Sequence, residues 1–147
     1  MKTVGFLTPL TVTEMGEGIW KLANPFYATV QEDGVRVEII IPAGFFTDFA
    51  SVPRLPFAYL LYGGIGNRAG VVHDALYSPW TGIKVFILEG GKEKTFEVTR
   101  EWADDVLSAA LRSCGIGAFA RGMMWAGVRS FGWRFYKKPP LVEYSEG

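Results

Sequence analysis

The pattern of hydrophobic and polar residues predicts β-structure in the first half of the chain. The strongest strand signals are residues 26–31 and 35–41, which are rich in β-branched and aromatic residues. An Asp-Gly pair at residues 33–34 lies between them, and this pair in a short connection predicts a β-hairpin. Alternate positions of the second strand share one apolar face: Val35, Val37, Ile39 and Ile41.

Weaker strand signals lie on both sides of this hairpin. Residues 4–10 form a short apolar stretch with Pro9 near its end, which suits an edge strand. Residues 19–23 are typical of another short strand. Residues 84–88 and 95–98 flank a polar segment that contains two glycines, so we expect a second hairpin there.

Helical patterns occupy most of the second half. Asn67 is expected to cap a helix over residues 68–77, which ends before a Ser-Pro pair. Thr99 is expected to cap a longer helix that runs through Cys114. Gly115 follows as the residue that ends it, because a left-handed backbone at this position favours glycine.

The last predicted helix covers about residues 118–130 and carries a stripe of small residues. The stripe repeats every four positions and consists of Ala118, Gly122, Ala126 and Ser130. Small side chains let a neighbouring helix approach closely, so we expect this stripe to pack inside the domain. Together the elements predict a single α+β domain over residues 1–136, with antiparallel hairpins packed against about three helices. An extended tail is expected over residues 137–147.

Composition narrows the class of protein. The chain has 147 residues, 49% hydrophobic and 20% charged, which suits one folded domain and excludes intrinsic disorder. One Cys and one His exclude a disulfide framework and every Cys/His zinc finger. Fifteen basic residues balance fifteen acidic ones, so wholesale binding to a polyanion is not expected. We also expect no transmembrane helix and no signal peptide.

Four short motifs stand out along the chain: G-F-F-T-D-F-A-S-V-P-R at residues 44–54, H-D-A-L-Y at 73–77, A-D at 103–104 and V-R-S-F-G at 128–132. In this order they resemble a small family of bacteriophage and prophage proteins of unknown function. The resemblance extends over roughly residues 35–132. It implies a phage origin, a location in the host cytoplasm or the virion, and other phage proteins as partners. It brings no established reaction with it.

The motifs supply three candidate site residues: Asp48, His73 and Asp104. One His with two or more carboxylates is the ligand set of a divalent metal that activates water for hydrolysis. Asp74 is adjacent to His73 on a helix, so their side chains diverge by about 100° and do not easily share one metal. Alternatively, His73 acts directly and Asp48 or Asp104 orients it. We therefore expect these residues to meet at the centre of a small hydrolase that acts on the cell envelope or a phosphoester.

Two other interpretations of these residues stay open. Ser51, His73 and Asp48 or Asp74 are the residue types of a nucleophilic triad, although Ser51 lacks the G-x-S-x-G turn. In a purely structural arrangement, Asp48 caps its own loop, His73 is buried and Asp104 forms a salt bridge. An enzyme requires these side chains to converge in an open cleft, whereas a structural network requires them to be buried and mutually satisfied.

The C-terminal segment is basic and aromatic, and no acidic residue occurs between Asp105 and Glu143. These residue types are favoured at interfaces. The candidate contact residues are Arg121, Trp125, Arg129, Trp133 and Arg134. We expect them to dock on another protein or on a second copy, and nucleic acid is less favoured because the net charge is zero. The alternative function is therefore a non-enzymatic virion component of the tail or neck.

Overall fold

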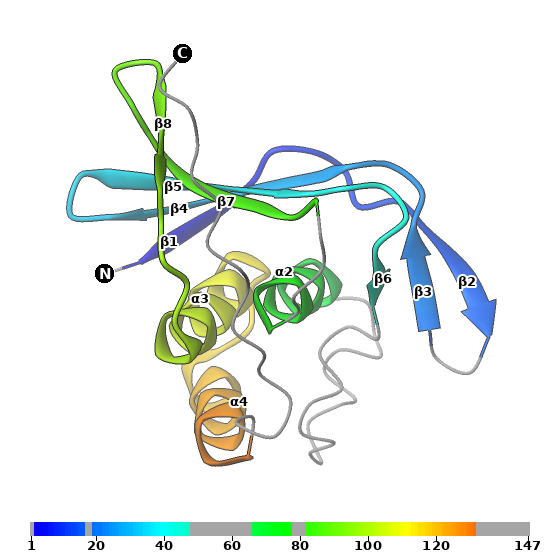
Figure 1. The fold of residues 1–147 in the computed structure, drawn as a ribbon. Helices are drawn as coiled ribbons and strands as arrows, with labels where there is room; N and C mark the ends of the chain where they lie inside the picture. The colour runs from blue at the N-terminus through cyan, green and yellow to red at the C-terminus, as the bar shows by residue number, and fades with distance from the viewer. Residues whose placement is uncertain (1, 17–18, 48–65, 78–81, 132–147) are drawn as a thin grey trace.

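The computed structural model describes residues 2–16, 19–47, 66–77 and 82–131. These residues form eight strands and three helices in an α+β arrangement, as the sequence predicts (Figure 1). None of the helices in these ranges is long and apolar enough to cross a membrane.

A five-stranded antiparallel sheet forms one layer, in the order β1-β4-β5-β7-β8. Its strands are β1 (Thr3–Phe6), β4 (Phe26–Glu32), β5 (Val35–Ile41), β7 (Lys84–Glu89) and β8 (Lys92–Thr95). The predicted hairpin between β4 and β5 is confirmed, with Glu32 paired to Val35. Asp33 and Gly34 have φ of 52° and 78°, as a type I′ turn requires.

Three details of the sheets differ from the predictions. The second hairpin turns at Gly90 and Gly91, with φ of 59° and 77°, so its second strand covers Lys92–Thr95 and ends at the residue where the predicted strand 95–98 begins. β1 ends at Phe6, before the proline that was expected near the strand's end. The sequence did not predict the strand Val12–Gly16 (β2), because four of its five residues are exposed and show no apolar alternation.

β2 belongs to a small second sheet with β3 (Ile19–Leu22) and β6 (Phe46–Thr47), in the order β2-β3-β6. β6 lies in a segment that the sequence favours as an ordered loop. Phe45, just before it, is buried, as expected for a packed segment. This sheet places Thr47 beside the helical layer.

The helices are α2 (Asn67–Tyr77), α3 (Arg100–Ser113) and α4 (Ala118–Phe131). The cap of α3 is confirmed, because the Thr99 hydroxyl accepts a hydrogen bond from Trp102 N at 3.1 Å. At its other end Gly115 (φ 86°) donates to Arg112 O and Ile116 donates to Leu111 O, which is a Schellman motif.

The cap expected at Asn67 is wrong. Asn67 is the first residue of α2, and its buried Oδ1 has no hydrogen-bond partner. The helix therefore begins one residue earlier than predicted.

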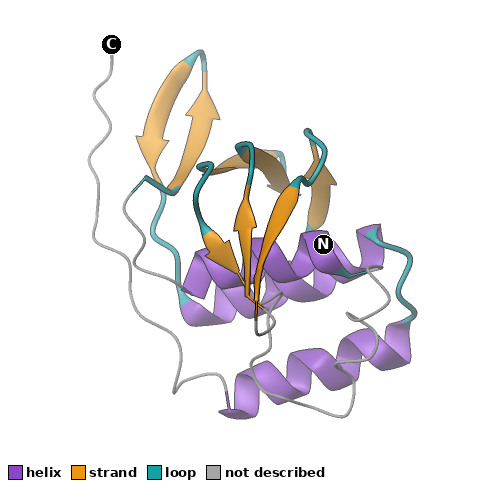
Figure 2. Ribbon diagram, turned by 90° about the vertical axis from the view of Figure 1, so that its right-hand side faces the viewer, coloured by secondary structure: helices purple, strands orange, loops and turns teal. Residues whose placement is uncertain are grey.

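The helices lie on one side of the five-stranded sheet in two layers (Figures 1 and 2). α2 contacts β5 and β6, α3 contacts β1, and α2 and α3 contact each other. α4 packs against α3 and forms the outer layer. The core between the sheet and the inner helices contains the largest fully buried apolar side chains, among them Phe26, Ile39, Ile41, Leu76, Leu107 and Leu111.

The small-residue stripe of α4 faces solvent, which corrects the expectation that it packs inside the domain. All four stripe residues are exposed, whereas Met124 and Gly127 are buried. A Cβ atom added at Gly122 would meet nothing within 4 Å. Helical periodicity gives the composition of each face but does not say which face the rest of the fold covers.

Candidate functional site

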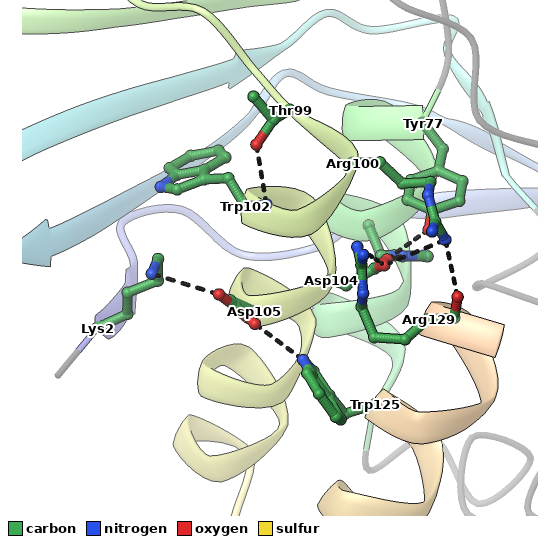
Figure 3. Close-up of polar contacts among 10 residues, drawn as sticks. Lys2, Tyr77, Thr99, Arg100, Trp102, Asp104, Asp105, Trp125 and Arg129 are labelled. Carbon is green, nitrogen blue, oxygen red and sulfur yellow. Dashed lines mark hydrogen bonds and ion pairs between the residues drawn. The ribbon is translucent and has the colours of Figure 1, made fainter. Parts of the chain in front are cut away.

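Asp104 is the centre of a polar network among the three described helices (Figure 3). It lies in the N-terminal half of α3, and its side chain is fully buried. A buried carboxylate is costly unless it is paired and hydrogen-bonded. The identity of its partners therefore decides what Asp104 does.

Two partners come from α2. His73 Nε2 lies 3.1 Å from Asp104 Oδ1, and the Tyr77 hydroxyl donates to the same oxygen. His73 is only 1% exposed, and its ring lies 4.1 Å from that of Tyr77, centroid to centroid. The sequence interpretation missed Tyr77, although its spacing of four from His73 places both side chains on one helix face.

Two cations complete the network. Arg129 Nη1, from α4, lies 3.2 Å from Asp104 Oδ2, and Arg100 Nη1 lies 3.7 Å from the same oxygen. Arg100 also donates to the Arg129 carbonyl at 3.2 Å, which ties α3 to α4 a second time. The sequence interpretation placed Arg129 among the docking residues, but its guanidinium binds Asp104 within the chain. Arg100 was missed, although it precedes Asp104 by one helical turn.

Asp74 points away from this network, as its position next to His73 predicts. Its Oδ2 accepts a hydrogen bond of 2.6 Å from Thr47 Oγ1, which joins α2 to β6. Asp48 follows Thr47 in the chain but lies outside the described residues, as does Ser51. The structure therefore brings together His73 and Asp104 of the predicted site, and the place of Asp48 stays a prediction.

The surroundings of Asp104 suit a structural or orienting carboxylate better than a metal ligand. Its two oxygens are occupied by a histidine, a tyrosine and two guanidinium groups. Among the described residues, no three His, Cys, Asp or Glu side chains form a group that could hold a metal ion. Both His73 and Asp104 are buried and hydrogen-bonded, as a structural network requires.

The network joins three of the four motifs, and the Thr47–Asp74 bond adds the remaining one. A family model for proteins of unknown function, DUF1353, matches residues 20–128. The chain belongs to the DUF1353 family. No curated protein and no solved structure matches it. In this DUF1353 member the matched residues include His73, Asp74, Tyr77 and Asp104, whereas Arg129 lies one residue beyond them.

The other predicted contact residues have bonds of their own. Arg121 Nη1 donates to Ile116 O at 2.8 Å. Trp125 Nε1 donates to Asp105 Oδ1 at 2.8 Å (Figure 3). Trp125 remains 40% exposed. Trp133 and Arg134 lie outside the described residues, so the docking role of this set stays a prediction.

Cys114 does not resemble a reactive thiol. Burial raises the pKa of the Cys114 thiol above its ordinary value, which reduces the fraction of nucleophilic thiolate.

Alkaline pH should destabilise the fold through Tyr77. Burial and, after it, the hydrogen bond to Asp104 raise the pKa of Tyr77 above its ordinary value of 10.0. The unfolded chain therefore loses this proton at lower pH than the folded chain. The contribution is fully present below about pH 10 and is lost as pH rises further, at up to about 1.4 kcal/mol per pH unit. Urea unfolding between about pH 9 and pH 11 measures this slope. Tyr77→Phe should flatten it, and an equal slope in that variant would show that other groups cause it.

Proposed function

We propose that this DUF1353 member is a non-enzymatic component of a bacteriophage-type particle, in the tail or neck, that docks on a neighbouring protein through α4. The observation that carries the proposal is the outer face of α4. This face consists of the small-residue stripe with Phe119, Met123 and Trp125 beside it. Phe119 is 78% exposed, and the other two are 40% exposed. Contiguous apolar surface of this kind is typical of interaction sites.

The buried network supports the same function. His73, Tyr77, Arg100 and Arg129 all bind Asp104, so these polar side chains join α2, α3 and α4. A network that fixes three helices provides a rigid support for the docking face. The assignment to a particle rests on the resemblance of the motifs to bacteriophage and prophage proteins. Docking through α4 fits this assignment, because the proteins of a particle contact their neighbours.

Replacing Gly122 by Leu should weaken docking at least tenfold. A leucine at this position would keep a partner away from the stripe, whereas a Cβ here meets nothing within 4 Å in the free protein. Gly122→Leu should therefore fold and melt like the parent protein. Incorporation of the tagged protein into purified particles, together with sedimentation for self-association, measures the effect.

Gly122→Ala is the matched control, because alanine keeps the stripe small. It should incorporate like the parent protein. Normal incorporation of Gly122→Leu would refute docking through this face.

A second candidate function is a hydrolase in which His73 moves a proton and Asp104 orients its ring. The 3.1 Å contact between His73 Nε2 and Asp104 favours it, because a carboxylate on one ring nitrogen fixes the tautomer of the other. A divalent metal remains part of this candidate through Asp48, and the substrate would be cell-envelope material or a phosphoester. The stability of an Asp104→Asn variant separates the two candidates.

A further inference from the structure

A polar groove lies beside the outer face of α4, between α3, α4 and the edge of the five-stranded sheet. Its volume is about 350 Å³, and its charged and aromatic lining consists of Lys2, Glu32, Asp105, Arg112, Arg121 and Trp125. The α3 residues that line it recur at helical spacing, and the two α4 residues are one turn apart. Both helices therefore present one continuous edge to the groove.

Both carboxylates of the groove are paired with the same lysine, Lys2. Lys2 Nζ lies 2.7 Å from Glu32 Oε2 and 3.6 Å from Asp105 Oδ2. The hydrogen bond from Lys2 holds the pKa of Glu32 below its ordinary value. Trp125 Nε1 donates to the other oxygen of Asp105, which fixes the indole as one wall (Figure 3).

The opposite end of the groove is basic. α3 and α4 are joined by a short turn, so Arg112 and Arg121 both lie near that turn. Arg112 donates to Lys2 O at 2.5 Å and Arg121 donates to Ile116 O at 2.8 Å. The Ile116 carbonyl orients the Arg121 guanidinium without neutralising its charge, and no carboxylate of the described residues forms an ion pair with Arg121. The lining has three cations and two carboxylates, an excess of one positive charge.

We propose that this groove binds one acidic side chain of the protein that docks on α4. The inference rests on the proposed function and adds the chemistry of the partner. A Glu or Asp side chain would place its carboxylate against Arg121, where the planar guanidinium can bind both oxygens. An apolar neighbour in the same segment would cover the exposed ring of Trp125. Charge complementarity of this kind gives an interface its specificity and register.

Two blocked synthetic peptides test this proposal: Gly-Leu-Glu-Phe-Gly and the same sequence with Gln in place of Glu. Each is titrated into the full chain labelled with ¹⁵N, and the indole N–H resonance of Trp125, assigned with Trp125→Phe, reports binding. The Glu peptide should bind at least about tenfold more tightly than the Gln peptide. Arg121→Gln should remove this preference. Arg68→Gln should keep the preference for the Glu peptide, because Arg68 is an exposed cation on α2 and is not one of the residues that line the groove.

Equal binding of the two peptides to the parent protein would overturn the proposal without any variant. So would a preference that survives in Arg121→Gln, or one that Arg68→Gln removes equally. Tighter binding of a single-stranded oligonucleotide at the Trp125 resonance would show that the partner class is wrong. If the peptides fail while Gly122→Leu still blocks incorporation, only the groove proposal fails. If Gly122→Leu is incorporated normally while the Glu peptide binds, docking through α4 fails and the groove site stands.

Discussion

Replacing Asp104 by Asn should lower the free energy of unfolding by about 3–5 kcal/mol. The substitution keeps the shape of the side chain but removes its charge. Arg100 and Arg129 would then lie in the helical layer without the carboxylate that both now approach. The new amide N–H₂ would also face groups that donate. Urea unfolding at neutral pH measures the change.

Asp105→Asn is the matched control, because it makes the same chemical change one residue further along α3. Asp105 is only half-buried and is bound by Lys2 and Trp125 near the surface. Its substitution should cost no more than about 1 kcal/mol.

The result for Asp104 also decides between the two candidate functions. Catalytic groups are selected for reactivity, often at some cost in stability, so replacing one commonly leaves the fold intact. An Asp104→Asn variant as stable as the parent protein would refute the structural network and favour the hydrolase. A loss of several kcal/mol would favour the structural component.

The parts of the fold that the sequence predicts correctly depend on local chemistry. The Asp33-Gly34 turn, the Thr99 cap and the Gly115 end of α3 each follow from the conformational preference or hydrogen-bonding capacity of one or two residues. β2 escaped prediction because an exposed strand has no apolar alternation. Asn67 shows the limit of such rules. Asparagine is a residue type that suits a cap, but here it is the first residue of the helix itself.

The candidate site is predictable only in part for a similar reason. His73 and Asp104 are recognisable because polar residues in apolar segments require partners. The sequence around Arg129 is typical of a surface segment. Only the packing of α4 on α3 brings its guanidinium to Asp104. The orientation of the α4 stripe was predicted wrongly for the same reason. Its periodicity is correct, but the packing of α4 on α3 decides which face of the helix is covered.

Replacing Arg129 by Gln should destabilise α4 more than the rest of the protein. Arg129 is the residue of α4 that binds Asp104, so its loss removes a charge-assisted hydrogen bond of about 1.5–3 kcal/mol. Arg100 still faces Asp104 in this variant, so the loss should be smaller than for Asp104→Asn. Amide hydrogen exchange measures it locally: the α4 amides should exchange faster, while those of the β4–β5 hairpin should change little.

Arg121→Gln is the control on the same helix, because it removes a guanidinium that bonds only to the carbonyl of Ile116 among the described residues. It should leave the exchange of the α4 amides within about threefold of the parent protein, the effect of a bond worth about 0.5 kcal/mol.

If α4 loosens in Arg129→Gln, that variant should also be incorporated poorly, because a detached helix cannot present a fixed docking face. Unchanged exchange in α4 would show that apolar packing on α3 alone holds the helix, and the network would then have no part in supporting the docking face.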